Sequence, residues 1–155
     1  RDVERVVLME NKYYHFMRAR SDSETAKYRS DMYAKREEEH GWMLDLYKHW
    51  NVDSDESREM IYRRYIERVV GCIENVTNSA CTLSFKEKMQ EIKNIITSDN
   101  VRKSLKIAKP NSLVMKLMLI PIKLKFTFLT YLEGTFISKV KSGNVKLFAK
   151  LKANR

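Results

Sequence analysis

The sequence predicts a mainly α-helical bundle that carries a short N-terminal β-hairpin and a basic amphipathic helical tail. A chain of 155 residues is long enough to bury one hydrophobic core. With 43% apolar residues but only four Gly and two Pro, the composition favours a folded helical protein over a disordered one. Apolar residues also recur every three or four positions along most of the chain, which is the spacing of helices that each bury one face.

Charge separates the chain into a nearly neutral body and a cationic tail. Residues 1–109 hold 21 Lys or Arg against 19 Asp or Glu, a balance of +2, whereas residues 110–155 hold nine basic residues and one acid, Glu133, a balance of +8. We therefore divide the chain into a strand and loop region at 1–25, a helical body at 26–109 and a basic amphipathic helical tail that follows it.

The first region is predicted to contain the β-hairpin. Residues 6–9 are β-branched or apolar, and residues 13–19 alternate in the manner of an extended strand, with Tyr14 and Phe16 on one side. The Glu-Asn pair at 10–11 lies between the two runs and would close the turn. Because the chain begins with Arg instead of Met, we expect it to be a fragment or a processed product.

The body is predicted to begin with a helix at about 30–50. Its apolar residues recur at helical spacing on one side, and a charged run at 35–39 is assigned to the solvent side. The residues assigned to the core are Tyr33, Met43, Leu44, Tyr47 and Trp50, and those assigned to solvent are Lys35, Arg36, Glu37, Glu38 and Glu39.

A second helix is predicted to start at Asp53, because Asp53 followed by Glu56 has the spacing of a capping box. This helix carries the best-formed apolar stripe in the chain, and we expect it to pack antiparallel to the first across the short connection at 51–53. The stripe consists of Ile61, Tyr62, Tyr65, Ile66, Val69, Val70, Ile73 and Val76.

Two shorter helices are predicted to complete the body. The first starts at Ser84, where Glu87 supplies a second capping box, and it is expected to bury one apolar face. The next starts at Asp99 and is stopped by Pro110. The residues assigned to the core are Phe85, Met89, Ile92 and Ile96 from the first helix, and Val101, Leu105 and Ala108 from the second.

The tail is predicted to form two or three short helices. Ser112 caps a segment at 113–126 that is apolar almost all round, and this segment is too short to span a bilayer, which needs about 20 residues. A second helix is expected to end at Gly143, and a third pattern follows at 145–152. The second helix is assigned the stripe Leu129, Leu132, Phe136, Ile137 and Val140.

Lysine alternates with bulky apolar residues through this tail, as in helices that lie in a membrane interface. Each lysine near an anionic leaflet contributes about 1 kcal/mol of attraction. The alternative is that these helices complete the core of the bundle and present a solvated basic face. The residues assigned to a membrane contact are Lys116, Lys123, Lys125, Phe126, Lys146, Phe148, Lys150 and Lys152.

The order of segments resembles the C-terminal end of bacterial family-2 glycosyltransferases that build surface polysaccharides. The likeness lies in the stretch YYHFMRARSDSETAKYR at 13–29, in the helix KREEEHGWMLDLYKHW at 35–50, and in the segments AKPNSLVMKLMLIPIKLK and KLFAKLKANR of the tail. In such enzymes a nucleotide-sugar-binding GT-A domain comes first, and a strand closes it before a helical tail. The resemblance implies that this chain is the rear portion of an enzyme and is inactive alone.

On this resemblance, five residues would lie near the nucleotide diphosphate or the acceptor. They are His15, Arg18, Arg20, Ser21 and Ser23, and arginines and hydroxyls of this kind suit phosphate oxygens. Ser21 with Glu24 also has the spacing of a helix capping box, a structural role that is compatible with the first. No catalytic residue is assigned.

The resemblance also implies partners and a place in the cell. The partners would be the chain's own N-terminal catalytic domain, a nucleotide-sugar bound through the full enzyme, and an anionic membrane surface. The full enzyme would use a divalent metal, although no cofactor is assigned to these 155 residues. The enzyme would be cytoplasmic and peripheral at the inner face of the cell membrane.

Three further motifs favour structural explanations. The Asp-Ser-Asp sequence at 53–55 matches a metal-binding Asp-x-Asp but is predicted to open a helix. Glu37 and His40 have the spacing of a di-iron ligand pair, yet the sequence has no second pair, so we assign them to a solvated helix face. Cys72 and Cys81 fit no zinc spacing and are expected to be buried thiols.

A second class of function is a non-catalytic basic module that binds nucleic acid or an acidic partner. The make-up of the tail disfavours nucleic acid, because its cations are almost all lysines threaded through aliphatic residues, with Arg155 as its one arginine. Exposed apolar faces on such a chain would also favour self-association.

Overall fold

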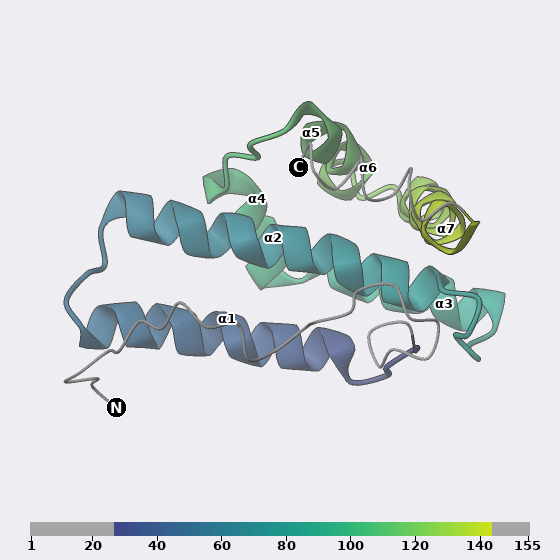
Figure 1. The fold of residues 1–155 in the computed structure, drawn as a ribbon, viewed down its shortest axis with the longest axis horizontal. Helices are drawn as coiled ribbons and strands as arrows, with labels where there is room; N and C mark the ends of the chain where they lie inside the picture. The colour runs from purple at the N-terminus through teal and green to yellow at the C-terminus, as the bar shows by residue number, and fades with distance from the viewer. Residues whose placement is uncertain (1–26, 144–155) are drawn as a thin grey trace, which may run out of the picture.

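The computed structural model describes residues 27–143, and every regular element within that range is a helix (Figure 1). The helices are α1 (Met32–His49), α2 (Asp55–Thr77), α3 (Phe85–Thr97), α4 (Asp99–Ile107), α5 (Leu113–Met118), α6 (Ile120–Lys123) and α7 (Thr127–Gly143). The predicted helical bundle is therefore confirmed. The predicted β-hairpin lies outside the described residues.

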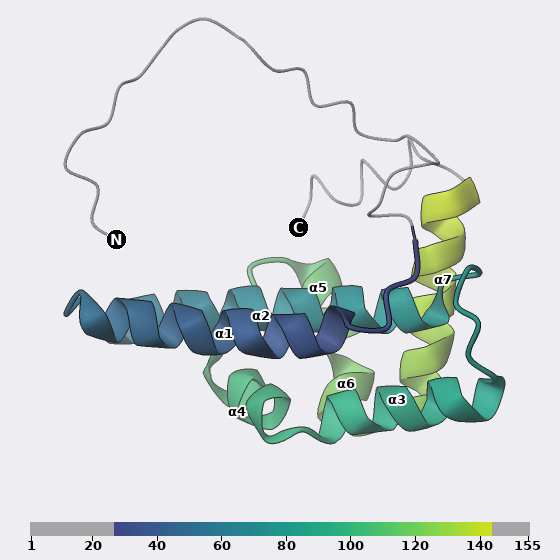
Figure 2. The same ribbon diagram turned by 90° about the horizontal axis from the view of Figure 1, so that it is seen from below.

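The helices are arranged around α2. The long helices α1 and α2 lie side by side and antiparallel, as predicted, while α5, α6 and α7 lie on the opposite side of α2 from α1 (Figure 1). Helix α3 runs back along α2 and α4 packs against α2, while α7 crosses α2 and α3 instead of running along them (Figure 2). Consequently α2 contacts α1, α3, α4 and α7.

The apolar stripe of α2 forms the centre of the core. All eight residues predicted for the stripe are at most 5% exposed. Six of them form one cluster with Ile92, Ile95 and Ile96 of α3 and Val101 of α4, all four of which are fully buried; the six are Tyr65, Ile66, Val69, Val70, Ile73 and Val76. Since burying one such side chain stabilises a fold by about 1.5–3 kcal/mol, this cluster supplies much of the favourable free energy of folding.

The start of α2 differs from the prediction by one residue. Ser54 is the N-cap, and its hydroxyl accepts a hydrogen bond of 3.2 Å from the backbone N–H of Ser57. The predicted capping box of Asp53 with Glu56 is therefore wrong. Instead, the Asp53 carboxylate binds the guanidinium of Arg58 through two hydrogen bonds. A bidentate arginine contact competes effectively for a carboxylate that would otherwise cap the helix.

The buried side of α1 is more polar than predicted. Trp50 is 47% exposed, and Tyr33, Met43, Leu44 and Tyr47 are only partly buried. The one fully buried residue of α1 is His40, which was assigned to solvent. The assignment of the whole charged run at 35–39 to solvent is also wrong, because Arg36, Glu37 and Glu39 are half-buried. Hydrophobic periodicity misses this face because its contacts with α2 are hydrogen bonds and ion pairs.

The caps of the shorter helices follow the prediction more closely. The capping box of α3 is present: the Ser84 hydroxyl accepts from the Glu87 N–H at 3.3 Å, and the Glu87 carboxylate accepts from the Ser84 N–H at 2.7 Å. Helix α4 is capped by Ser98 and ends at Ile107, before Pro110. Phe85 was predicted to be core but is 57% exposed, since it lies on the first turn and packs edge-to-face on Tyr131.

The segment at 113–126 folds as two short helices instead of one. Ser112 caps α5 as predicted, accepting from the Met115 N–H at 3.2 Å. Pro121 stands at the first turn of α6, where a missing N–H is tolerated. After α6 the chain turns at Lys125, which has a positive φ of 58°. These two breaks place α6 against α7.

Most of the predicted apolar stripe of α7 does not face the core. Leu129, Leu132 and Phe136 are 48%, 46% and 66% exposed, so the alternative that the tail helices complete the core is wrong for these three residues, although Ile137 of the same stripe packs against the core. The buried residues of α7 are the small ones, Thr130 and Gly134. A Cβ added to Gly134 would lie 2.9 Å from Ile73 Cγ2 and 2.9 Å from Thr77 Oγ1. Small residues therefore let α7 cross α2 at close range.

We predict that Gly134→Ala lowers the free energy of unfolding by about 1–3 kcal/mol, as overpacked sites do. The atoms that would clash belong to β-branched side chains, which move little. The matched control is Gly71→Ala in α2, where a Cβ meets nothing within 4 Å. This control should gain about 0.5–1 kcal/mol from the better helix propensity of alanine. Urea denaturation of both variants measures the difference, and equal effects would contradict the close crossing.

Candidate functional site

Some of the predicted site residues fall within the described part of the chain and others do not. His15, Arg18, Arg20, Ser21 and Ser23 lie outside the described residues, as do Lys146, Phe148, Lys150 and Lys152. Lys116, Lys123, Lys125 and Phe126 are described, and all four are exposed. The candidate site is therefore built from α5, α6 and α7.

Exposed apolar side chains gather on these three helices. Nine large ones are each at least 45% exposed. We call them, together with the three lysines between them, the apolar–lysine face. It consists of Leu113, Leu117, Ile120, Leu124, Phe126, Phe128, Leu129, Leu132, Phe136, Lys116, Lys123 and Lys125. Monomeric soluble proteins seldom expose so many large apolar side chains on adjoining elements, and such surfaces mark interaction sites.

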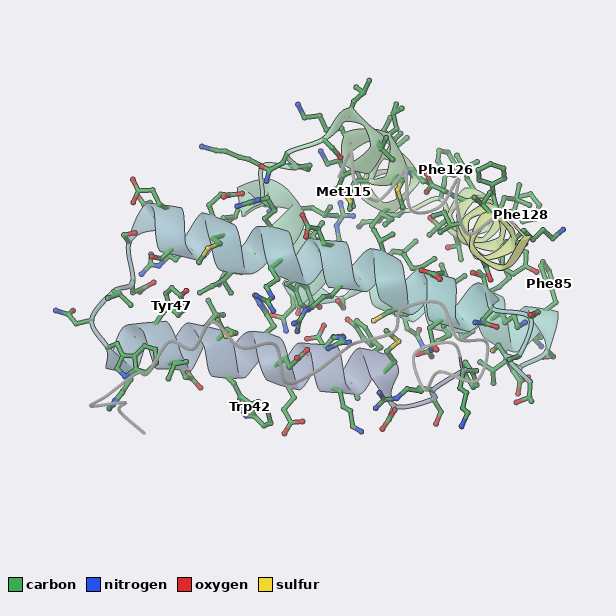
Figure 3. All side chains as sticks on the ribbon, viewed as in Figure 1. Trp42, Tyr47, Phe85, Met115, Phe126 and Phe128 are labelled. Carbon is green, nitrogen blue, oxygen red and sulfur yellow. The ribbon has the colours of Figure 1, made fainter. Side chains whose placement is uncertain are left out.

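The apolar–lysine face points away from the body. Figure 3 shows Phe126 and Phe128 on the outer side of α6 and α7 relative to α2. Among the ion pairs of residues 27–143, none involves Lys116, Lys123 or Lys125. The face therefore combines apolar side chains with ammonium groups that are available to an external anion.

Residues 113–126 have one side in the core and one side at the surface. Met115, Met118, Leu119 and Ile122 are buried against the core, each at most 8% exposed. The exposed members are Leu113, Leu117, Ile120, Leu124 and Phe126. One apolar side of the segment therefore completes the core, and its other apolar side lies at the surface.

Glu133 is the one acidic residue of the tail, and it is half-buried on α7. Burial raises the pKa of its carboxyl to about 7. A substantial fraction of Glu133 is therefore neutral near pH 7, which makes the surroundings of the apolar–lysine face less negative than the sequence suggests.

Glu37 and His40 do not lie on a solvated helix face, and that prediction is wrong. The Glu37 carboxylate accepts hydrogen bonds from the Tyr65 hydroxyl of α2 and from the Asn100 amide of α4. Burial raises the pKa of Glu37, but the hydrogen bonds from its neighbours outweigh burial, so the net shift is downward. Burial and Glu37 together raise the pKa of Tyr33 to about 12. This network holds α1 to two other helices and serves structure.

The remaining motifs also have structural roles. The Asp-Ser-Asp sequence at 53–55 opens α2, as predicted. Within residues 27–143, no three side chains of the metal-binding types come together. Cys72 and Cys81 are free and buried, as predicted, and burial raises the pKa of the Cys72 thiol to about 12.

The side of α7 that faces the core cannot be chosen from its apolar stripe alone. The signal for it is the pair of small residues on the other side, Thr130 and Gly134, because a close helix crossing needs small side chains. Among the described helices, none is both long and apolar enough to cross a lipid bilayer.

Comparisons of this chain with protein-family models, with curated protein sequences and with solved structures gave no match.

We predict that Glu133→Gln stabilises the protein at pH 8 but not at pH 4. The folded-state pKa of about 7 is above the ordinary value of 4.5, so the folded state binds more protons than the unfolded state between these values. Wild-type stability therefore falls as pH rises from about 4.5 to about 7, and glutamine removes that loss. Thermal denaturation of both proteins across this range tests the prediction. A constant difference between them at all pH values would contradict it.

Proposed function

We propose that this chain is a helical module that attaches to anionic membrane surfaces through the apolar–lysine face. The observation that carries the proposal is the exposure of nine large apolar side chains, interleaved with lysines, on α5, α6 and α7. Apolar side chains at this density favour the boundary between headgroups and acyl chains, and lysines favour anionic lipids.

The resemblance to family-2 glycosyltransferases suggests which kind of enzyme such a membrane-binding module belongs to. It would be the C-terminal accessory region of an enzyme that transfers a sugar from a nucleotide-sugar to a surface glycan or a lipid-linked acceptor. Attachment to the cytoplasmic face of the membrane would keep the catalytic domain beside lipid-linked acceptors. The donor, and the divalent metal expected for the full enzyme, would be bound by that catalytic domain.

The second candidate is a non-catalytic basic module that binds nucleic acid or an acidic partner. The charge of the tail supports it, because nine basic residues face one acid there. Among the described tail residues all cations are lysines, however, and apolar side chains separate them. Bidentate base recognition favours arginine and polar side chains, so the membrane is the better account.

We predict that the chain sediments with vesicles of phosphatidylcholine mixed with phosphatidylglycerol, and much less with phosphatidylcholine alone. Replacing Lys116, Lys123 and Lys125 together by Gln should weaken binding to the mixed vesicles by roughly 100-fold, at about 1 kcal/mol for each lysine. Phe126→Gln with Phe128→Gln should weaken binding to both kinds of vesicle by roughly 100-fold, at about 1.5 kcal/mol for each Phe. Trp42→Gln is the matched control, since Trp42 is 62% exposed but lies on α1.

Salt-dependent binding to duplex DNA without binding to either vesicle would overturn the membrane proposal in favour of the second candidate. The glycosyltransferase assignment has a separate test in the coding DNA upstream of the Arg1 codon. The assignment requires the frame to continue into an α/β domain of about 200 residues with an Asp-x-Asp after a strand. A frame that begins close to Arg1 would remove this assignment and leave the membrane test unaffected.

A further inference from the structure

A groove lies between α1 and α2, and none of the residues that line it belongs to the apolar–lysine face. Its volume is about 420 Å³, which is the size of a small-molecule site. Polar residues of both helices line it, with Arg36 and His40 from α1 and Arg64 and Arg68 from α2. Since α5, α6 and α7 lie on the other side of α2, this groove is a separate surface (Figure 1).

The groove contains buried polar atoms that lack partners. His40 is 5% exposed, and neither of its ring nitrogens has a hydrogen-bond partner among the described residues. Arg36 Nε is buried and unpartnered in the same way, and it lies one helical turn before His40. These three are the only such side-chain atoms within residues 27–143. Buried polar atoms in folded proteins are nearly always paired, so their concentration at one groove points to a ligand.

The His40 ring is held in a fixed orientation. It stacks on Tyr65 with ring centroids 4.2 Å apart, and the edge of Tyr62 lies against it at 5.0 Å. Burial lowers the pKa of His40, so the ring is neutral near pH 7 and offers one N–H donor and one acceptor. A fixed, neutral donor is suited to hydrogen-bond an anionic oxygen.

The charge of the groove favours an anion. Three arginines and Glu39 line it, a balance of two positive charges. Arg36 and Arg68 both pair with Glu39, whereas Arg64 is exposed and has no partner among the described residues. The planar fork of a free guanidinium matches the oxygens of phosphate.

The remaining wall of the groove is apolar and aromatic. It includes Met43, Tyr47 and Met60, and Met60 is 42% exposed although it is a large apolar residue. Figure 3 shows Tyr47 near the end of α1, beside the connection to α2. A bare inorganic anion would leave this wall uncovered.

We propose that the groove between α1 and α2 binds an organic phosphate, in which Arg64, Arg36 and His40 hold the phosphate and the apolar wall holds the attached ring or chain. The phosphate would give Arg64 a partner, and it would satisfy Arg36 Nε and the His40 donor once the side chains that cover these two atoms move. Glu39 would stay bound to Arg68 and limit the site to one phosphate group.

The test is a titration of the full chain with phenyl phosphate, followed through the imidazole resonances of His40 in ¹H–¹⁵N NMR spectra. We expect saturable shifts of these resonances, which a His40→Gln variant identifies, and weaker binding of inorganic phosphate or phenol alone. Arg64→Gln should raise the dissociation constant for phenyl phosphate roughly tenfold, because it removes charge-assisted hydrogen bonds. Arg64 is exposed, so this variant should fold normally.

The matched control is Arg63→Gln, the neighbouring residue on α2, whose guanidinium pairs with Glu59 outside the groove. It carries the same change in net charge and should leave the affinity unchanged. The proposal is overturned if phenyl phosphate leaves the His40 resonances unmoved, or if Arg63→Gln and Arg64→Gln weaken binding equally.

A competition experiment distinguishes a soluble organic phosphate from a lipid headgroup as the natural ligand. Vesicles that contain phosphatidic acid should not displace phenyl phosphate if the ligand is soluble, whereas displacement would assign the same phosphate site to a lipid. Arg64→Gln should bind phosphatidylglycerol vesicles as the wild type does. If the groove does not bind phenyl phosphate, the proposed membrane function is unaffected. If the chain does not bind vesicles, the proposed phosphate site is unaffected.

Discussion

The fold depends on the burial of α2, which has to be covered on more than one side. Its stripe is wider than one helix neighbour can cover, with Tyr65, Val69 and Ile73 all at most 3% exposed. Helix α1 covers one side, and α3, α4 and α7 cover the rest. Because α2 supplies one partner of most interhelical contacts, the position of every other long helix is set by which part of α2 it covers.

The contact of α1 with α2 relies on polar groups to a degree that is unusual for a helix pair. From α1, Glu37 accepts a hydrogen bond from Tyr65 of α2, and Glu39 pairs with Arg68 of α2. Polar contacts of this kind require the correct rotation of α1 about its axis, because a turned helix would leave half-buried charges unpaired. They therefore contribute to the uniqueness of the packing as well as to its stability.

The parts of the fold that the sequence predicts well are those governed by local rules. The capping box at Ser84 and the stripe of α2 need only near neighbours in the chain, and both are present. The faces of α1 and α7 could not be predicted, because their packing depends on distant partners. For α1 the partners are hydrogen-bonding groups, which hydrophobic periodicity does not count. For α7 a close approach to Ile73 favours Gly134 over the larger apolar residues.

The same division applies to the candidate site. The exposed lysines of the tail could be assigned from charge alone, since ammonium groups seldom leave water. The unpartnered nitrogens of His40 could not, because the neighbours of a buried ring are known only when the helices are assembled. Arg36 and His40, which were assigned to the solvent side and are partly or fully buried, line the α1–α2 groove, where the unpartnered nitrogens also lie.

The small-residue crossing of α7 has a consequence for which of its residues are able to change. The helix turns Gly134 and Thr130 inward and Phe136 outward, while Tyr131 and Ile137 pack partly against the core. Separation of α7 would uncover Ile73 and Thr77 of α2, which lie against Gly134. The inward positions of α7 therefore tolerate little added volume. Its outward apolar side chains can be changed without disturbing that crossing, so the surface of α7 can vary while the fold stays the same.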